Sequence, residues 1–227
     1  MNNPLIIWRH SHSTTLFQAA ASILLCLLLA LSVTTGAIAQ SAPQTILVVG
    51  DSLSAEYGLP RGTGWVALMQ ARVQQRAPDT QVINASISGD TSAGGKARLP
   101  AALQQHHPSI VIIELGANDA LRGLSLDATA ANLESMVEMS QAAGAKVLLL
   151  GVQVPPNYGR NYTEQFAQMY VRIAQEKNTA LVPFFLKGIA DVADSEQYFQ
   201  RDRTHPNQSA HPIILENVWP EFEKMLN

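Results

Sequence analysis

The chain has 227 residues, of which 47% are hydrophobic and 15% are charged, and its formal net charge is −3. This composition excludes a disordered or fibrous protein, because the chain can bury enough apolar surface to offset the conformational entropy lost on folding. The slight acidic excess gives no basic footprint for nucleic acid, so we expect no nucleic-acid partner. The length fits one domain, or at most two small ones.

The first 39 residues differ in composition from the rest of the chain. They contain no Asp or Glu, and Arg9 precedes an apolar stretch from Ala19 to Val33. That stretch is shorter than the roughly 20 residues that a membrane-spanning helix needs. The small residues Ala37 and Ala39 fit the pattern that signal peptidase recognises. We therefore expect residues 1–39 to be a cleaved signal peptide and the mature protein to be periplasmic or secreted. An uncleaved membrane anchor is the alternative.

Cys26 is the only cysteine, and it lies inside the predicted signal peptide. The exported protein would therefore have no disulfide, no thiol nucleophile and no cysteine-based metal site. His211, in the last predicted helix, has no further ligands at metal spacing, and we expect it to be a surface or packing residue. We expect neither a metal nor a cofactor.

From Gln44 onward, short apolar runs alternate with longer segments of helical periodicity. The predicted strands span residues 45–49, 81–85, 110–115, 147–150 and 181–183. The predicted helices lie between them and at the C-terminus, where residues 208–226 would form the last one. Apolar runs without alternation indicate strands that are buried on both faces, and alternation with helices indicates parallel crossovers. The pattern predicts one α/β domain over residues 40–227, a three-layer α/β/α sandwich with a mainly parallel sheet of about five strands.

Ligands of such sheets bind outside the carboxyl ends of the strands, so the residues that follow each strand carry the functional information. Gly50-Asp51-Ser52 follows the first strand. We expect Ser52 to stand at the start of a helix, where backbone N–H groups favour negative charge on an attacking hydroxyl. Taken alone, Ser52 fits an ordinary helix cap equally well.

The second and third strands are also followed by residues that could take part in catalysis. After the second strand, Gly89 can expose its backbone N–H, and Asn84 and Asp90 can brace its loop. After the third strand, Asn118 offers a neutral side-chain amide that suits an oxyanion. Each of these segments could also be a simple turn.

The C-terminal part contains a carboxylate three residues before a histidine. Asp202 can reach the Nδ1–H of His205 from the same turn, which would fix the tautomer and leave Nε2 free to accept a proton. Pro206 suits the first turn of the last helix. An ordinary pair of charges on a solvated loop is the alternative interpretation of this segment.

In this order, the four segments resemble the four sequence blocks of the SGNH, or GDSL, hydrolase superfamily. The resemblance extends from Gln44 to the C-terminus. The segments GDSLSAEYG, NASISGDTSAGGKARLP, ELGAND, LRG, PPNYGRNY, LVPFF and HPN are similar to the exported bacterial subgroup of multifunctional thioesterases, arylesterases and lysophospholipases. The resemblance implies a flavodoxin-like SGNH hydrolase fold and a serine esterase that acts on aryl esters, acyl-CoA thioesters and lysophospholipids.

The resemblance also implies a role for each matching residue. Ser52 would be the nucleophile, His205 the general base and then acid, and Asp202 the residue that orients it. The oxyanion would be bound by the backbone N–H groups of Ser52 and Gly89 and by the side chain of Asn118. The expected partners are small acyl esters or thioesters, with no stable membrane anchor after processing, and we expect a monomer.

Three further residues are candidates for substrate binding. Glu56 stands where the family suggests a small residue, and we expect its carboxylate one helical turn from Ser52. Leu121 lies in a segment, residues 120–125, that the resemblance places over the acyl chain. Tyr158, in a loop rich in Pro, Asn and Gly, could form a wall of the site.

Other functions remain as alternatives at this stage. A nucleotide-binding module of flavodoxin-like topology would need a Gly-x-Gly-x-x-Gly cradle, which the loop after the first strand lacks. A carbohydrate O-deacetylase of the same superfamily is the alternative among enzymes. A non-catalytic binding module is disfavoured because all four sequence blocks are intact.

Overall fold

The computed structural model describes residues 44–226. The predicted signal peptide and its cleavage point lie outside these residues. The unit over Ser41–Asn227 is built from alternating strands and helices. In chain order these are β1 (Thr45–Gly50), α2 (Trp65–Arg76), β2 (Gln81–Asn84), α3 (Ser92–His106), β3 (Ile110–Glu114), α4 (Ala117–Leu121), α5 (Leu126–Ala142), β4 (Lys146–Leu150), α6 (Arg160–Glu176), β5 (Ala180–Val182) and α7 (His211–Glu223).

The sheet is parallel throughout, with the strand order β2-β1-β3-β4-β5. The register pairs Val48 of β1 with Asn84 of β2 on one side and with Ile112 of β3 on the other. All five residues of β3 are buried, and so are the last five of β1. These two strands therefore form the centre of the core, as expected for a sheet covered on both faces.

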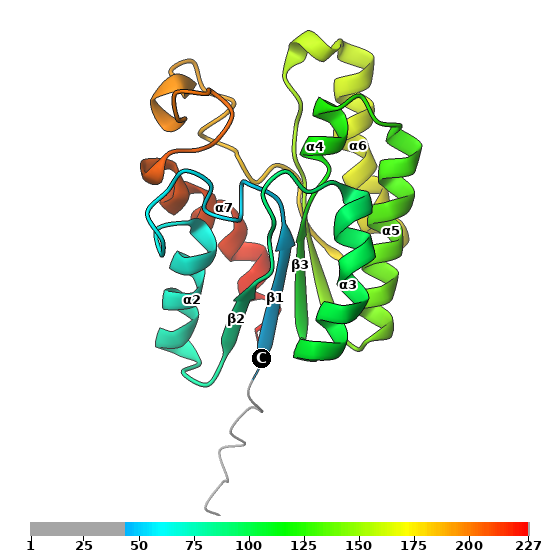
Figure 1. Ribbon diagram of the computed structural model, residues 1–227, viewed down its shortest axis with the longest axis vertical. Helices are drawn as coiled ribbons and strands as arrows, with labels where there is room; N and C mark the ends of the chain where they lie inside the picture. Colours follow the sequence, from blue (N-terminus) through cyan, green and yellow to red (C-terminus); the bar gives the residue numbers. More distant parts are fainter. Residues whose placement is uncertain (1–43, 227) are drawn as a thin grey trace, which may run out of the picture. The chain divides into compact units, whose positions relative to one another are not determined.

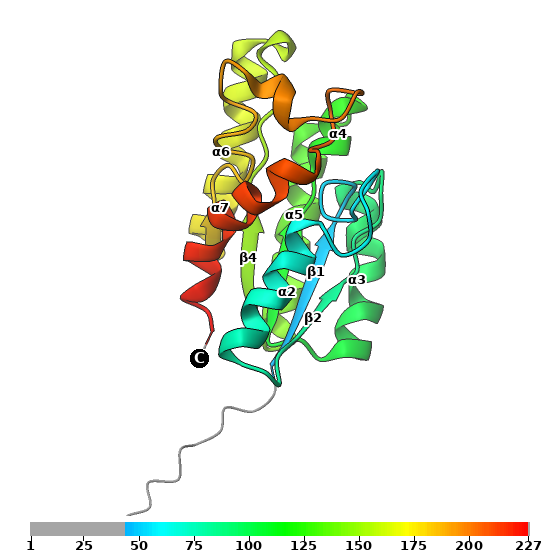
Figure 2. The same ribbon diagram turned by 90° about the vertical axis from the view of Figure 1, so that its left-hand side faces the viewer.

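Helices cover both faces of the sheet. Figure 1 shows α3, α5 and α6 on one face, and α2 and α7 on the other. The second pair lies side by side in front of the sheet in Figure 2. The fold class predicted from the sequence is confirmed, and all five predicted strands are present. The loops that follow the carboxyl ends of the strands gather at one end of the sheet, at the top of Figure 1.

One local expectation is wrong. No helix begins at Ser52, because residues 52–58 form consecutive turns and the first helix of the described chain begins only at Trp65. The last helix begins with a 3-10 turn over Gln208–Ala210, and its α-helical part starts at His211. His211 is buried, and its Nδ1 accepts the N–H of Trp65 at 3.0 Å, so of the two expected roles the structure shows the packing one, and this side chain helps to cap α2.

Within residues 44–226, no helix is both long and apolar enough to cross a membrane. No group of three or more His, Cys, Asp or Glu side chains in this part of the chain could hold a metal ion.

Candidate active site

The loops after β1 and β5 bring Ser52 and His205 together, although 153 residues separate them in the sequence. The Oγ of Ser52 lies 3.0 Å from the Nε2 of His205. On the other side of the imidazole, Nδ1 lies 2.7 Å from an Oδ2 of Asp202. The three side chains thus form one continuous chain of hydrogen bonds, in which a proton can pass from a hydroxyl to an imidazole that a carboxylate orients.

Asp202 is fixed by the turn that it begins. Its Oδ1 accepts the backbone N–H groups of Thr204 and His205, each at 3.0 Å. These two hydrogen bonds, together with the one from the His205 ring, lower the pKa of Asp202 to about 2. The carboxylate is therefore ionised at every pH at which an imidazole can act as a base. It also fixes the tautomer in which Nδ1 carries the proton.

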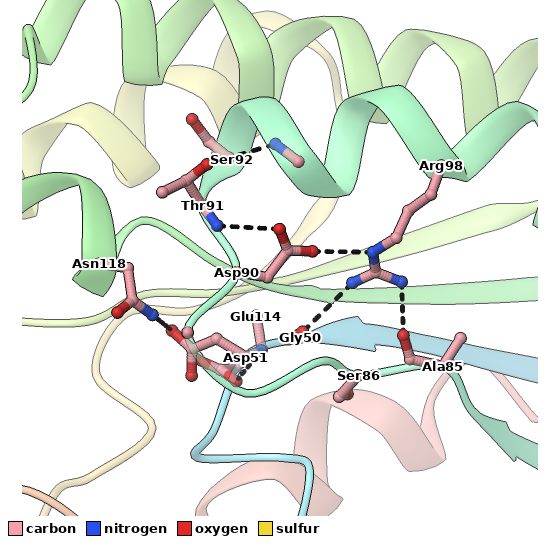
Figure 3. A network of polar contacts seen from close by, with 12 residues as sticks. Gly50, Asp51, Ala85, Ser86, Asp90, Thr91, Ser92, Arg98, Glu114 and Asn118 are labelled. Carbon is pink, nitrogen blue, oxygen red and sulfur yellow. Dashed lines mark hydrogen bonds and ion pairs between the residues drawn. The ribbon is translucent and has the colours of Figure 1, made fainter.

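A second carboxylate, Asp51, lies directly before Ser52 and is completely buried. Its two oxygens accept the backbone N–H of Leu53 at 3.0 Å and the side-chain Nδ2 of Asn118 at 2.9 Å. Burial raises the pKa of Asp51 to about 6, although both hydrogen bonds oppose the increase. Because one N–H of the Asn118 amide is committed to Asp51, the plane of that amide is fixed. Figure 3 shows this contact.

Glu114 lies beneath Asp51, at the end of β3. Its Oε2 accepts the hydroxyl of Ser54 at 2.7 Å and the N–H of Asp51 at 3.3 Å, whereas its Oε1 is buried without a partner. Burial, and secondarily the charge of Asp51, raise the pKa of Glu114 well above its usual range. Both effects favour the protonated form of this acid. Gly50 permits this close packing, because a Cβ there would lie 2.8 Å from Glu114.

Arg98 of α3 ties the loop after β2 to the sheet. Its Nε donates to Asp90 at 2.7 Å, and its two other nitrogens donate to the carbonyl oxygens of Ala85 and Gly50. Figure 3 shows the guanidinium between these three partners. The expected brace by Asp90 is confirmed, since its other oxygen accepts the N–H of Thr91. The other expected brace, Asn84, donates to the carbonyl of Ser54 at 2.8 Å.

Gly89 and Ser52 each supply an uncommitted backbone donor. None of the hydrogen bonds formed within residues 44–226 is donated by the N–H of Ser52 or of Gly89. The carbonyl of Gly89 accepts Nη2 of Arg122 at 2.7 Å, which ties the loop after β2 to the loop after β3. These two free N–H groups and the Asn118 amide are hydrogen-bond donors of the kind that stabilises an oxyanion.

A cleft of about 450 Å³ lies at this end of the sheet. Ser52, Asn118 and His205 line it, together with apolar side chains from four loops. The apolar lining consists of Leu53, Ala117, Leu121, Val152, Val154, Pro155, Leu186, Ala190 and Phe199. Further polar side chains, among them Gln153, Glu196 and Arg203, line the same cleft. The apolar residues beside the reactive groups suit a substrate that has one reactive bond and an acyl chain.

The candidates for substrate binding differ in position. Leu121 lines the cleft, whereas Glu56 and Tyr158 are not among its lining residues. The expectation for Glu56 is wrong because residues 52–58 are not helical. Its carboxylate turns instead to the backbone N–H groups of Gly62 and Gly64. Tyr158 stacks against Tyr162, with ring centroids 6.2 Å apart.

Sequence reasoning missed several residues that support the site. Asp119 is buried beside Asn118 and accepts hydrogen bonds from Ser92 and Thr129, which joins α4 to α3 and α5. Glu114 and Arg98 were missed as well. A detectable signal existed for Glu114, because it is the one charged residue in the apolar run of β3.

Comparisons with known proteins identify similar sequences and structures. The model of the GDSL-like lipase/acylhydrolase family matches residues 48–213. "Esterase TesA" of Pseudomonas aeruginosa is 53% identical over 187 residues, which are 82% of this chain and 92% of that protein. "Thioesterase 1/protease 1/lysophospholipase L1" of Escherichia coli K12 is 41% identical over 187 residues, 82% of this chain and 87% of that protein.

A solved structure is similar as well. The psychrotrophic esterase EstA from Pseudoalteromonas, in a structure inhibited by monoethylphosphonate, superimposes with a TM-score of 0.74 at 42% sequence identity. The match covers 80% of this chain and 97% of that one.

Proposed function

This chain belongs to the GDSL-like lipase/acylhydrolase family and is an ester hydrolase, and on that basis we propose that it cleaves its substrates through an acyl-enzyme on Ser52. The observation that carries this proposal is the hydrogen-bonded chain from Ser52 through His205 to Asp202. The substrates are carboxylic esters, including aryl esters and lysophospholipids, and acyl thioesters such as acyl-CoA. The names of the relatives and the apolar cleft support this substrate range.

In the first half of the reaction, the Oγ of Ser52 attacks the carbonyl carbon of the substrate while Nε2 of His205 takes the hydroxyl proton. The carbonyl oxygen becomes an oxyanion, which the N–H groups of Ser52, Gly89 and Asn118 stabilise. His205 then gives its proton to the leaving alcohol or thiol as the bond to the carbonyl carbon breaks. An ester of Ser52 remains.

In the second half, a water molecule takes the place of the leaving group. His205 removes a proton from the water as its oxygen attacks the acyl carbon, and the same donors bind the second oxyanion. The proton returns to Ser52 when the acid leaves. Throughout the cycle, the ionised Asp202 stabilises the positive charge that His205 carries in each transition state.

The acyl chain occupies the apolar part of the cleft. Leu121 contributes from the segment after β3, and Val152 and Val154 contribute from the segment after β4. Because these residues come from separate loops, the length of acyl chain that fits depends on how the loops sit against one another. A series of esters that differ only in chain length measures this dependence.

The location of the enzyme follows from the N-terminal composition. Residues 1–39 have the apolar stretch and the small residues of a cleaved signal peptide. We place the mature enzyme in the periplasm or outside the cell, where it acts as a monomer. Mass spectrometry of the protein purified from the producing cell tests this assignment by locating its N-terminus.

The mechanism is tested with a reagent that phosphonylates active serines. It should abolish activity against p-nitrophenyl butyrate, and peptide mapping should find the label on Ser52. Ser52→Ala should be inactive and unlabelled. A label on another serine, or activity in Ser52→Ala, would overturn the mechanism. A panel of p-nitrophenyl esters of two to sixteen carbons, with acyl-CoA, lysophospholipid and an acetylated sugar, then ranks the substrates.

A further inference from the structure

The ring of Tyr57 lies against the imidazole of His205. The ring centroids are 4.3 Å apart, and the two planes are tilted by 37°. Tyr57 is 49% exposed, so packing in the core does not account for its position. It is not among the residues that line the cleft, so substrate binding does not account for it either. What Tyr57 contacts is the imidazole that exchanges protons with Ser52.

The backbone before Tyr57 is held in an unusual conformation. Glu56 has a φ of 58°, in the left-handed region that residues other than glycine rarely adopt. Its carboxylate accepts the N–H of Gly62 at 3.0 Å and the N–H of Gly64 at 2.7 Å. Gly64 is needed there, because a Cβ at that position would lie 2.6 Å from the Cγ of Glu56. These contacts stabilise the turn that directs residue 57.

The backbone of Tyr57 is also tied to the segment that carries His205. The Nε2 of Gln200 donates to the carbonyl of Tyr57 at 2.8 Å and to the carbonyl of Pro206 at 3.1 Å. The N–H of Gln200 donates to the carbonyl of His205 at 2.8 Å. A single residue thus connects the two backbones, and the contact between the rings does not depend on the rings alone.

The contact has different energies in the two charge states of His205. The face of an aromatic ring carries negative electrostatic potential and attracts a cation within about 6 Å of its centroid. A neutral imidazole gains little from this field, but an imidazolium gains more. In the proposed mechanism, the imidazolium forms as Ser52 loses its proton and disappears as the leaving group departs. A contact that is stronger in the transition state than in the resting enzyme raises kcat.

We propose that Tyr57 is a further catalytic residue, whose ring stabilises the imidazolium form of His205 during acyl transfer. The proposal rests on the function proposed above, in which His205 is the base. Other charged groups act on His205 as well: Asp202 contacts Nδ1, and Asp51 acts through its field. Arg203 and Glu196, which are paired with each other, line the same cleft as His205. All of them are retained when only residue 57 is changed, so their effects cancel in a comparison of variants.

The test compares Tyr57→Leu, which removes the aromatic face, with Tyr57→Phe, which keeps it. With saturating p-nitrophenyl butyrate, Tyr57→Leu should lower kcat about two- to fivefold with little change in KM. Tyr57→Phe should keep most of the wild-type kcat. The acid limb of the profile of kcat/KM against pH should move down by about 0.4 to 0.7 pH unit in Tyr57→Leu, because the imidazolium has lost a stabilising contact. Tyr57→Phe should keep the position of the wild-type limb.

Other outcomes would overturn the proposal. Equal kcat in the Leu variant and the wild type would show that the ring does not contribute, and an equal loss in both variants would assign the effect to the hydroxyl. A change in KM alone would make Tyr57 a binding residue. If Tyr57→Leu does not fold, 4-cyanophenylalanine at position 57 keeps the ring but weakens the potential of its face, and it should lower kcat in the same way. Labelling of Ser52 by the phosphonate in the wild type separates the two proposals. If Ser52 is not labelled, the mechanism itself is overturned. If Ser52 is labelled, the variants of residue 57 test the role of the Tyr57 ring alone.

Discussion

Asp51 and Asp202 are two carboxylates of one site in opposite environments. Asp51 is completely buried, and burial raises its pKa to about 6. The side chain of Asp202 is 42% exposed, and hydrogen bonds from its own turn lower its pKa to about 2. Both carboxylates accept backbone N–H groups, so hydrogen bonding alone does not separate them. The difference is that Asp51 has lost its hydration and Asp202 has not.

This difference assigns the two carboxylates to different tasks. Asp202 remains an anion, so it can stabilise a cation that forms and disappears beside it. Asp51 can change its protonation near pH 6, and its partner is the neutral amide of Asn118, whose orientation it fixes. One carboxylate thus acts on the base and the other on the oxyanion donor. Substitutions on each side test the division.

The largest effect is expected on the exposed side. Asp202→Asn keeps the size of the side chain but presents an amide to Nδ1 of His205, which favours the wrong tautomer and removes the negative charge. We expect kcat for p-nitrophenyl butyrate to fall by about 10³- to 10⁴-fold, with the fold intact by circular dichroism. A loss below about tenfold would mean that Asp202 only shapes its turn.

The second-largest effect is expected at Asn118, which contacts Asp51 and is a proposed oxyanion donor. Asn118→Ala removes one donor to a charge that exists only in the transition state, so kcat should fall by about 100- to 1,000-fold. KM should change far less. Steady-state kinetics with the same ester distinguish the two parameters. If KM alone changes, Asn118 holds the substrate instead.

Asp51→Asn tests the effect of burial on stability. Since the pKa of Asp51 is raised in the folded state, that state binds the proton more tightly than the unfolded chain does. The wild type should therefore lose stability as the pH rises from about 4 to 6, by up to about 3 kcal/mol from this group.

Urea unfolding at pH 4, 5, 6 and 7 measures the trend. Asp51→Asn should show a smaller decrease over this range, because Asn does not titrate. A parallel decrease in the variant and the wild type would assign the trend to other groups.

The smallest effect is expected for Glu114→Gln. A glutamine resembles a protonated glutamate, with an oxygen that can accept the Ser54 hydroxyl and the Asp51 N–H. Because burial raises the pKa of Glu114 and so favours its neutral form, we expect kcat at pH 7 to change by less than about threefold. Glu114→Leu, which has no acceptor for Ser54, should lose much more stability in the same urea assay. A large loss of kcat in Glu114→Gln would show that an ionised Glu114 is needed.

The regular elements were predictable because their signals are local. The five strands are short apolar runs, and the periodicity of residues 126–142 shows one buried helical face. The side chain of Ser125 caps that helix. The order of the four motifs also led to Ser52 and His205. The turns after β1 were not predictable in this way, because helical spacing from Ser52 to Glu56 suggested a helix. The competing interaction is between the Glu56 carboxylate and backbone N–H groups six and eight residues ahead.

Contacts between distant segments were beyond the reach of sequence patterns. The ring of Tyr57 meets His205 only after the first and last loops have come together. Arg98 is one basic residue of a helix until its partners, one from β1 and two from the loop after β2, surround it. The sequence left a surface and a packing role open for His211, because its partner, the N–H of Trp65, lies 146 positions away. Each of these roles is created by packing, not by the residue's neighbours in the chain.

The carboxylate and the imidazole of this site come from one turn. Both oxygens of Asp202 are occupied within four residues, by the N–H groups of Thr204 and His205 and by the His205 ring. A rigid shift of the segment therefore changes the distance from His205 to Ser52 but leaves the pair itself intact. Natural selection can lengthen or shorten the connections on either side, and so alter access to the cleft, without rebuilding the pair. An enzyme whose carboxylate and imidazole stand on separate elements has no such freedom.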